Sequence, residues 1–314
     1  MEAVGAFDVV LAVGLFAVAG YALFGRSRVH AAAMFLVFGV LLAVSWAWLH
    51  APDVAIAEAV LGAGVTGVLV MNAVTATPEP PRALAGAGHR PGPWYGLLGG
   101  ALAAVLAMAL LGAVWQWQTV TGPGAVARGE MAATGVSHPV TAVLLNFRSY
   151  DTLLEIGVLA AAALGALALA PGGRLLPEPV PDTGPMGAMV RVVVPVLVLL
   201  LGWLLVAGST RPGGAFQAGA LLTGAVLMIY LAGLGPRRSM ERWVRPVLLA
   251  GLAAFLLLAA VSVALAGGWL VLGERWAGGV ILGLEAILML SIGATLAVLL
   301  VLMDRINAAA GDRV

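Results

Sequence analysis

Nine apolar runs of about 20 residues each limit what this chain can fold into. They lie at about residues 7–25, 29–49, 53–74, 94–115, 148–170, 189–208, 215–235, 246–268 and 277–303. A run of this length crosses the bilayer core as a helix, which satisfies its own backbone polar groups in lipid. Of the 314 residues, 62% are hydrophobic and only 10% are charged. The sequence therefore predicts an all-α, polytopic integral membrane protein with about nine transmembrane helices.

The distribution of arginine predicts the orientation of these helices. Every basic residue is arginine, and the chain contains no lysine. One side of the predicted membrane carries Arg26, Arg28, Arg82, Arg90, Arg174, Arg191, Arg237, Arg238, Arg242, Arg245, Arg305 and Arg313, and the other carries Arg128, Arg211 and Arg275. Because short cytoplasmic loops hold the excess positive charge, we expect the N-terminus outside and the C-terminus in the cytoplasm. We expect a multi-pass protein of the cell (plasma) membrane.

Two linkers rich in proline and glycine divide the chain into three modules. The linkers are residues 78–93 and 173–188, and neither composition can continue a helix. The modules are residues 1–77 with three predicted spans, 94–172 with two and 189–314 with four.

Carboxylates inside the predicted spans are the main functional signal. Glu58, Glu155 and Glu285 lie in the third, fifth and ninth spans. Because these spans all enter from the outer side, all three carboxylates lie in the outer half of the membrane. Intramembrane carboxylates are costly and usually functional, and their oxygens suit a proton or a hard cation. We expect one cluster on an ion path; the alternative is that the three helices are not adjacent.

Helical spacing places Arg148, Asp151 and Glu155 on one face of the fifth span. We expect Arg148 to pair with Asp151 near the membrane surface and Glu155 to lie deeper, at about 1.5 Å per residue. Asp53 marks the start of the third span. The alternative is that the pair only anchors the helix end and that Glu155 is hydrogen-bonded to a neighbouring helix.

The stretch RPGGAFQAGA, residues 211–220, predicts a break between the sixth and seventh spans. Pro212, Gly213 and Gly214 interrupt the helix, and Phe216 opens the next one. Non-helical backbone at membrane depth must be buried in protein or line a cavity. The alternative is a tight hairpin turn at the outer surface.

Several familiar motifs are absent or out of context. The chain has no cysteine, and its four histidines, His30, His50, His89 and His138, have no metal-ligand spacing. The GAGVTG stretch at 62–67 matches a dinucleotide-binding pattern but lies inside an apolar helix, which favours a packing face.

We see no nucleophile and base for catalysis. We expect a transporter subunit rather than an enzyme, with no cofactor, no nucleic-acid partner and no metal beyond a transported monovalent cation.

Three segments resemble known families. HAPDVAIAEAVLGAGVTGVL in the first module is similar to the MbhD domain, and VTAVLLNFRSYDTLLEIGVLAA in the second is similar to the MbhE domain. RPGGAFQAGALLTGAV in the third resembles the MnhB subunit of Mrp-type multisubunit sodium/proton antiporters. The first two domains also occur joined at the C-terminal end of the large Mrp subunit. Two positions depart from the family pattern, with Ala215 at a usual glycine and Ser209 at a usual histidine.

The resemblance implies an accessory subunit of a cation/proton antiporter, with other subunits, membrane lipid and transported Na⁺ or H⁺ as partners. Matched by position, its candidate residues are Asp53, Glu58, Arg148, Asp151 and Glu155, with the turn at Pro212, Gly213, Gly214 and Phe216. We expect Glu155 and Glu58 to matter most. Two alternatives stay open: a membrane-arm subunit of a redox-driven complex, such as a membrane-bound hydrogenase, and a structural scaffold for antiporter-like subunits.

Overall fold

The computed structural model describes residues 5–25, 27–76, 93–117, 127–169, 185–234 and 241–311. Over these residues the regular structure is entirely helical, which confirms the predicted all-α class. Most of both predicted linkers, 78–93 and 173–188, lies outside the described residues, as does His89.

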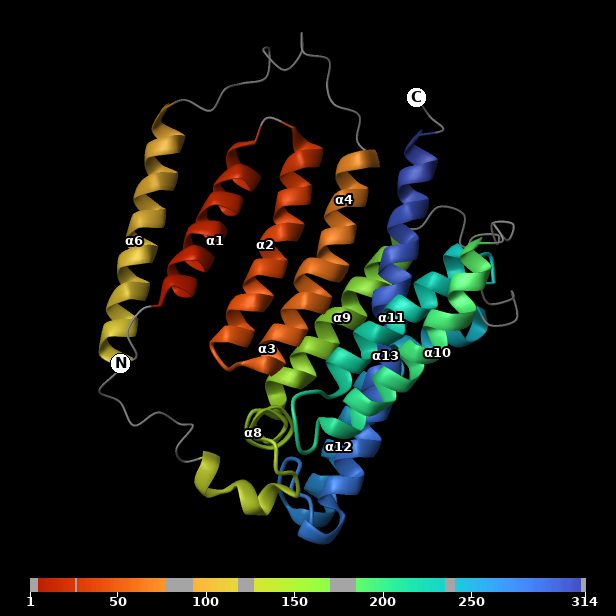
Figure 1. Cartoon of the computed structure of the whole chain (residues 1–314). Helices are drawn as coiled ribbons and strands as arrows, with labels where there is room; N and C mark the ends of the chain where they lie inside the picture. Colours follow the sequence, from red (N-terminus) through yellow and green to blue (C-terminus); the bar gives the residue numbers. More distant parts are fainter. Residues whose placement is uncertain are drawn as a thin grey trace. The chain divides into compact units, whose positions relative to one another are not determined.

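Each predicted apolar run is occupied by a helix (Figure 1). The helices with ten or more residues, and the pieces of the broken third run, are α1 (Ala6–Phe24), α2 (Arg28–Trp48), α3 (Pro52–Ala57), η1 (Glu58–Thr66), α4 (Gly67–Ala76), α6 (Pro93–Trp117), α9 (Ser149–Leu169), α10 (Pro185–Ala207), α11 (Ala215–Leu231), α12 (Glu241–Ala266) and α13 (Glu274–Gly311). In the described part of the chain, seven helices are long and apolar enough to cross a membrane, and Leu97–Ala113 and Ala215–Leu231 are shorter apolar helices. This is a multi-pass membrane fold; the predicted orientation stays a prediction.

The chain forms two compact units. The larger comprises Met1–Thr77 and Met131–Val314, and the smaller comprises Pro78–Glu130. The smaller unit contains α6, whose apolar residues are not confined to one stripe. A helix that is hydrophobic all round is typical of one surrounded by lipid or by other membrane helices.

Helix α13 is the central helix of the larger unit. It packs against α11, α12, α9 and α4. In its most apolar stretch 72% of the residues are buried, compared with 6% in α1. Gly219 of α11 lies close to the α13 backbone, where a Cβ would be 3.0 Å from the Met289 carbonyl oxygen. Small residues at such crossings let two helix backbones approach, and this approach fixes α11 against α13.

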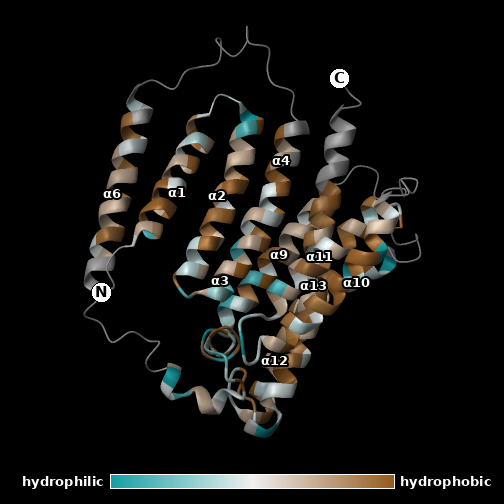
Figure 2. Ribbon diagram, viewed as in Figure 1, coloured by the Kyte–Doolittle hydropathy of each residue, from teal (hydrophilic) through white to brown (hydrophobic). Residues whose placement is uncertain are grey.

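The helices α1, α2 and α4 pack in chain order along one edge of the larger unit (Figures 1 and 2). Large apolar side chains on α1, such as Phe16 and Phe24, are more than four-fifths exposed. Near one end, the Trp48 indole Nε1 donates a hydrogen bond of 2.6 Å to Asp8. Such apolar surface requires lipid or another protein chain around it.

Two stretches of π-helix interrupt the regular helices near the candidate residues. The third run passes from α3 through the π-helix η1 into α4, so the GAGVTG stretch lies in helix, as predicted. The second, η3 (Val143–Phe147), follows the short α8 (Pro139–Ala142) and ends where α9 begins. Figure 1 shows α8 end-on while α9 runs along the plane of the view. The sequence did not predict this crossing segment.

Candidate functional site

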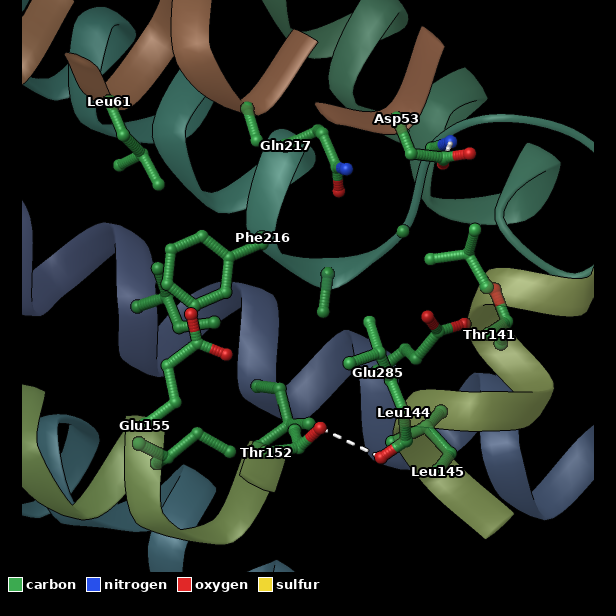
Figure 3. Close-up of a pocket in the computed structure, with 18 of the residues that line it drawn as sticks. Asp53, Leu61, Thr141, Leu144, Leu145, Thr152, Glu155, Phe216, Gln217 and Glu285 are labelled. Atoms are coloured by element: carbon green, nitrogen blue, oxygen red, sulfur yellow. Dashed lines mark hydrogen bonds between the residues drawn. The ribbon is translucent and has the colours of Figure 1, made fainter. Parts of the chain in front are cut away.

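A cavity of about 360 Å³ lies where α3, α8, α9 and the start of α11 meet the side of α13. Its titratable and polar side chains are Asp53, Thr141, Thr152, Glu155, Gln217 and Glu285 (Figure 3). The rest of the lining is mostly apolar and includes Leu61, Ile156 and Phe216. A mostly apolar cavity with a few convergent polar groups is the usual form of a binding site.

The glycine-rich turn before α11 is folded back onto the end of α10. Gly214 donates its backbone N–H to the Leu204 carbonyl at 2.9 Å. Gly213 and Gly214 have φ of 154° and 121°, which favour glycine, and both residues are buried. A Cβ on Gly213 would contact the same Leu204 carbonyl. The turn is therefore buried backbone that lines a cavity.

Glu285 of α13 is the buried carboxyl of this cavity. It is 4% exposed, and its Oε2 atom has no hydrogen-bond partner among the described residues. The backbone amide of Ala215, in the first turn of α11, interacts with the same carboxyl. The N-terminus of a helix presents unsatisfied N–H groups and a partial positive charge, which favour a carboxylate. Glu285 thus has one oxygen facing the start of α11 and one buried oxygen without a hydrogen-bond partner among the described residues.

Glu155 of α9 lines the same cavity from the opposite side. Figure 3 shows its side chain extending towards the ring of Phe216. One turn earlier, Thr152 donates a hydrogen bond of 2.7 Å to the Leu144 carbonyl, which ties α9 to η3. The structure therefore brings together two carboxyls that are 130 residues apart in the sequence, Glu155 and Glu285.

The third expected member, Glu58, does not line this cavity. Its neighbours Ala57 and Leu61 do, whereas the Glu58 carboxyl lies against Gly62 of its own helix. The shared site therefore contains two of the three predicted glutamates. The lining positions Asp53, Ala57 and Leu61 recur every four residues and share one helix face, whereas Glu58 lies about 100° around the helix from Ala57.

Arg148 and Asp151 form the predicted ion pair, with 2.7 Å between Nη2 and Oδ2. Both side chains are exposed, and neither lines the cavity. Pro212 of the turn is also outside the lining.

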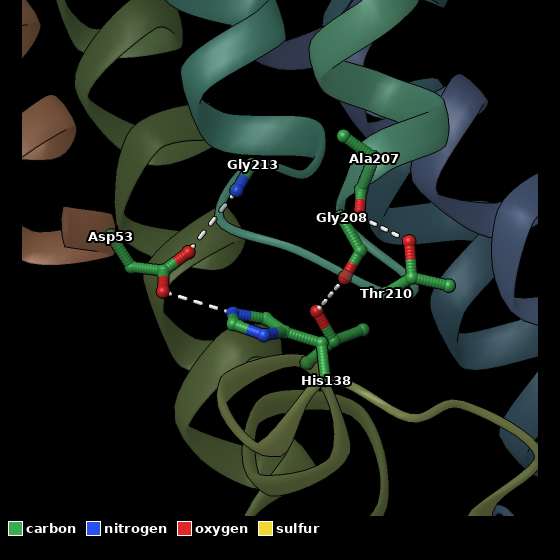
Figure 4. Close-up of polar contacts among 7 residues, drawn as sticks. Asp53, His138, Ala207, Gly208, Thr210 and Gly213 are labelled. Carbon is green, nitrogen blue, oxygen red and sulfur yellow. Dashed lines mark hydrogen bonds and ion pairs between the residues drawn. The ribbon is translucent and has the colours of Figure 1, made fainter.

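Asp53 joins the start of α3 to two distant segments (Figure 4). Its Oδ1 accepts the backbone N–H of Gly213 at 3.1 Å, and its Oδ2 lies 2.9 Å from His138 Nε2. His138 and Ser137 both donate their backbone N–H to the Ser209 carbonyl. Asp53 thus fixes the glycine-rich turn relative to the third span. Sequence reasoning missed His138, because no local spacing reveals a partner 85 residues away.

No group of three or more His, Asp or Glu side chains could hold a metal ion in the parts of the chain described. The carboxyls are accompanied by neutral oxygens of Thr141, Thr152 and Gln217, and oxygen ligands of both kinds suit hard cations.

Comparison with known families decides which domains these elements form. Residues 13–79 match MbhD, a family of MBH subunits. Residues 185–304 match a domain related to the MnhB subunit of Na⁺/H⁺ antiporter. The chain carries an MbhD domain and an MnhB-related domain. This confirms the resemblance of the first and third predicted modules; the MbhE-like second module stays a prediction.

The cavity is shared by both domains. The MbhD domain supplies Asp53 and Leu61, and the MnhB-related domain supplies the glycine-rich turn and Glu285. Glu155 comes from the region between the two matches. The site therefore exists because these segments are held together in one fold.

Two solved structures resemble this fold. A chain of the Mrp complex from Dietzia sp. DQ12-45-1b superposes with a TM-score of 0.73 and 22% identity, over 98% of this chain and 35% of that one. This chain thus spans about a third of the length of that relative. A chain of the membrane-bound sulfane sulfur reductase, an archaeal respiratory membrane complex, has a TM-score of 0.49 and 22% identity, over 65% of this chain and 97% of that one. No curated protein sequence matches the chain.

Proposed function

We propose that this protein is an accessory membrane subunit of a multisubunit monovalent cation/proton antiporter of the Mrp type. The observation that carries the proposal is the shared cavity of Glu155 and Glu285, in which a buried carboxyl keeps one oxygen without a hydrogen-bond partner among the described residues. The MnhB-related domain and the fold shared with an Mrp-complex chain support the same class of transporter.

The chemistry follows from charge balance in a medium of low dielectric constant. An isolated charge is costly inside the membrane, so a carboxylate must pair with a proton or a cation. Exchange of one for the other at Glu155 or Glu285 keeps the local charge constant. The hydroxyl of Thr152 and the amide of Gln217 can replace part of the hydration shell of a small cation.

The other candidates take supporting positions in this proposal. The exposed Arg148–Asp151 pair holds the start of α9 near the membrane surface. Glu58 lies next to the cavity wall and extends the path beyond the shared cavity. Asp53 holds the turn that places Gln217 and Phe216 at the cavity.

The chain does not act alone in this proposal. Its partners are the other antiporter subunits, which carry the principal proton-pumping helices, in the plasma membrane with the N-terminus outside. Its own role is that of a transporter subunit and not of an enzyme.

A second candidate is a membrane-arm subunit of a redox-driven complex, which the MbhD match favours. Purification from the native membrane in mild detergent, followed by mass spectrometry of the companions, separates the two. Antiporter-like companions alone support the exchanger, and redox subunits among them support the driven complex. Isolation without any companion would contradict both.

A further inference from the structure

The two carboxyls of the shared cavity differ in exposure, although both belong to its lining (Figure 3). Glu155 is exposed at the surface of this subunit. Glu285 is 4% exposed and keeps its Oε2 atom without a hydrogen-bond partner among the described residues. Glu155 therefore lies at the rim of the cavity, and Glu285 lies at its closed end.

Gly214 leaves a gap beside the buried carboxyl. A Cβ atom on Gly214 would lie 3.1 Å from Glu285 Oε1 and 3.7 Å from Gln217 Oε1. Apart from Gly214 and its two chain neighbours, no other described heavy atom lies within 4 Å of that point. Because Gly214 has a φ of 121°, which strongly disfavours any other residue, the gap is not filled by a side chain at this position. Two side-chain oxygens thus bound the gap.

Both oxygens at this gap are hydrogen-bond acceptors. An ionised carboxylate and the carbonyl of an amide have no proton to share, so two such oxygens facing one point repel each other unless a positive group lies between them. Gln217 is 9% exposed, so bulk water does little to weaken this repulsion. No arginine or histidine of the described chain lines the cavity. The positive group must therefore come from outside this chain.

A cation fits this position better than a water molecule. Water donates hydrogen bonds to both oxygens but leaves the charge of the buried carboxylate unbalanced, which is costly. A cation balances the charge as well, and carboxylate and amide oxygens are ligands that hard cations prefer. The positive N-terminus of α11 opposes a cation here. This opposition weakens the binding, and a transported ion must be able to leave its site.

We propose that the gap at Gly214 is the binding subsite of the transported monovalent cation, with Glu285 and Gln217 as its protein ligands. This assignment rests on the proposed antiporter function and adds an order to the path. The exposed Glu155 receives the cation at the rim, and Glu285 binds it at the closed end. The proton that replaces the cation binds Glu285 itself and needs no space beside Gly214. Gln217 therefore serves the cation and not the proton.

The test measures cation binding at Glu285 in the native complex, with Na⁺ as the probe. Dicyclohexylcarbodiimide modifies buried carboxyl groups in their protonated form, and mass spectrometry of the digested chain locates the modified residue. We expect Na⁺ to protect Glu285 of the wild type from modification. Gln217→Met removes one ligand but keeps the length of the side chain. It should need at least about ten times more Na⁺ for the same protection, the factor expected when one contact to a charged group is lost.

Two further variants separate ligand binding from packing. Gln217→Glu keeps an oxygen at the same distance and should retain protection at wild-type Na⁺ concentrations. Thr210→Val is the matched control, since Thr210 is exposed in the same connection between α10 and α11 and lies outside the cavity. It should behave as the wild type. The subsite is overturned if Na⁺ does not protect Glu285 in the wild type, or if it protects the wild type and Gln217→Met equally.

Sodium-dependent proton movement in the same preparation separates this inference from the proposed function. Loss of exchange in Glu285→Gln, together with wild-type protection in Gln217→Met, would keep the antiporter function and reject the subsite. Protection of Glu285 by Na⁺ in a wild-type complex that shows no exchange would keep the cation site and reject the antiporter function.

Discussion

At the scale of single residues, Asp53 shows how one buried carboxylate joins segments that are far apart in the sequence. Both of its oxygens are used, one by the Gly213 amide and one by His138. Leaving a buried donor without an acceptor costs about 1–3 kcal/mol. The side chain therefore has a structural role that its position at a helix start did not predict.

We expect Asp53→Ala to lower the free energy of unfolding by about 1–3 kcal/mol, because the Gly213 amide and His138 lose their acceptor. Asp53→Asn should cost less, since its amide oxygen can still accept one hydrogen bond. Thermal unfolding in detergent, followed by tryptophan fluorescence, measures both effects.

Asp151→Asn is the contrasting change. Arg148 and Asp151 form an exposed ion pair, and such pairs contribute about 0–1 kcal/mol. We expect only a small change in thermal unfolding. A loss of unfolding free energy as large as that of Asp53→Ala would contradict the small contribution expected of this exposed ion pair.

The backbone geometry at Gly213 makes this position sensitive to any added side chain. Alanine at this position combines an unfavourable positive φ with a Cβ that meets the Leu204 carbonyl. We expect Gly213→Ala to reduce assembly into the complex, measured by co-purification of companion subunits, because the start of α11 must move. Wild-type assembly and wild-type stability together would contradict this description of the turn.

At the scale of helices, the contact between α11 and α13 sets the position of the cavity. Thr223 donates to the carbonyls of Gly219 and Gly293, 3.1 Å away in each case, so its hydroxyl joins the two helices. Because Gln217 and Phe216 lie on α11 and Glu285 lies on α13, a change in helix separation changes the cavity.

Gly219→Leu and Gly224→Leu form a matched pair on α11. A Cβ atom at Gly219 meets the Met289 carbonyl and Ile292, whereas a Cβ atom at Gly224 meets nothing within 4 Å. We expect Gly219→Leu to lower the thermal unfolding temperature by several degrees and Gly224→Leu to leave it nearly unchanged. Equal unfolding temperatures would contradict the close approach of α11 to α13.

The helices could be predicted from the sequence, whereas their irregularities could not. Apolar runs of about 20 residues specify spanning helices through the thickness of the bilayer alone. The third run contains the π-helix η1, and α8 runs in a different direction from α9 (Figure 1); neither feature has a periodicity visible in the sequence.

At the scale of the whole molecule, the larger unit combines segments of the MbhD domain, the MnhB-related domain and the region between them. Glu155 and Glu285 lie on the fifth and ninth predicted spans, which enter the membrane from the same side, so the sequence predicted a similar depth for both. The structure places both at one cavity. The contact between Asp53 and His138 could not be predicted, because it depends on how three distant segments pack.

The exposed apolar surface also belongs to this scale. Large side chains on α1 and α10, such as Phe16, Leu23, Val192 and Leu199, are more than two-thirds exposed. Surfaces of this kind face lipid or other subunits. This agrees with a subunit that acts inside a larger assembly.

Sodium-dependent proton movement in vesicles tests the central claim most directly. The native complex is compared as wild type, Glu155→Gln and Glu285→Gln, with Glu130→Gln as a control because Glu130 is exposed and outside the cavity. Glutamine keeps the size and polarity of the side chain but cannot exchange a proton for a cation. We expect both cavity variants to assemble normally and to lose the sodium-dependent signal, while Glu130→Gln keeps it. Normal exchange in both cavity variants would remove the cavity from the ion path and leave the protein as a structural scaffold.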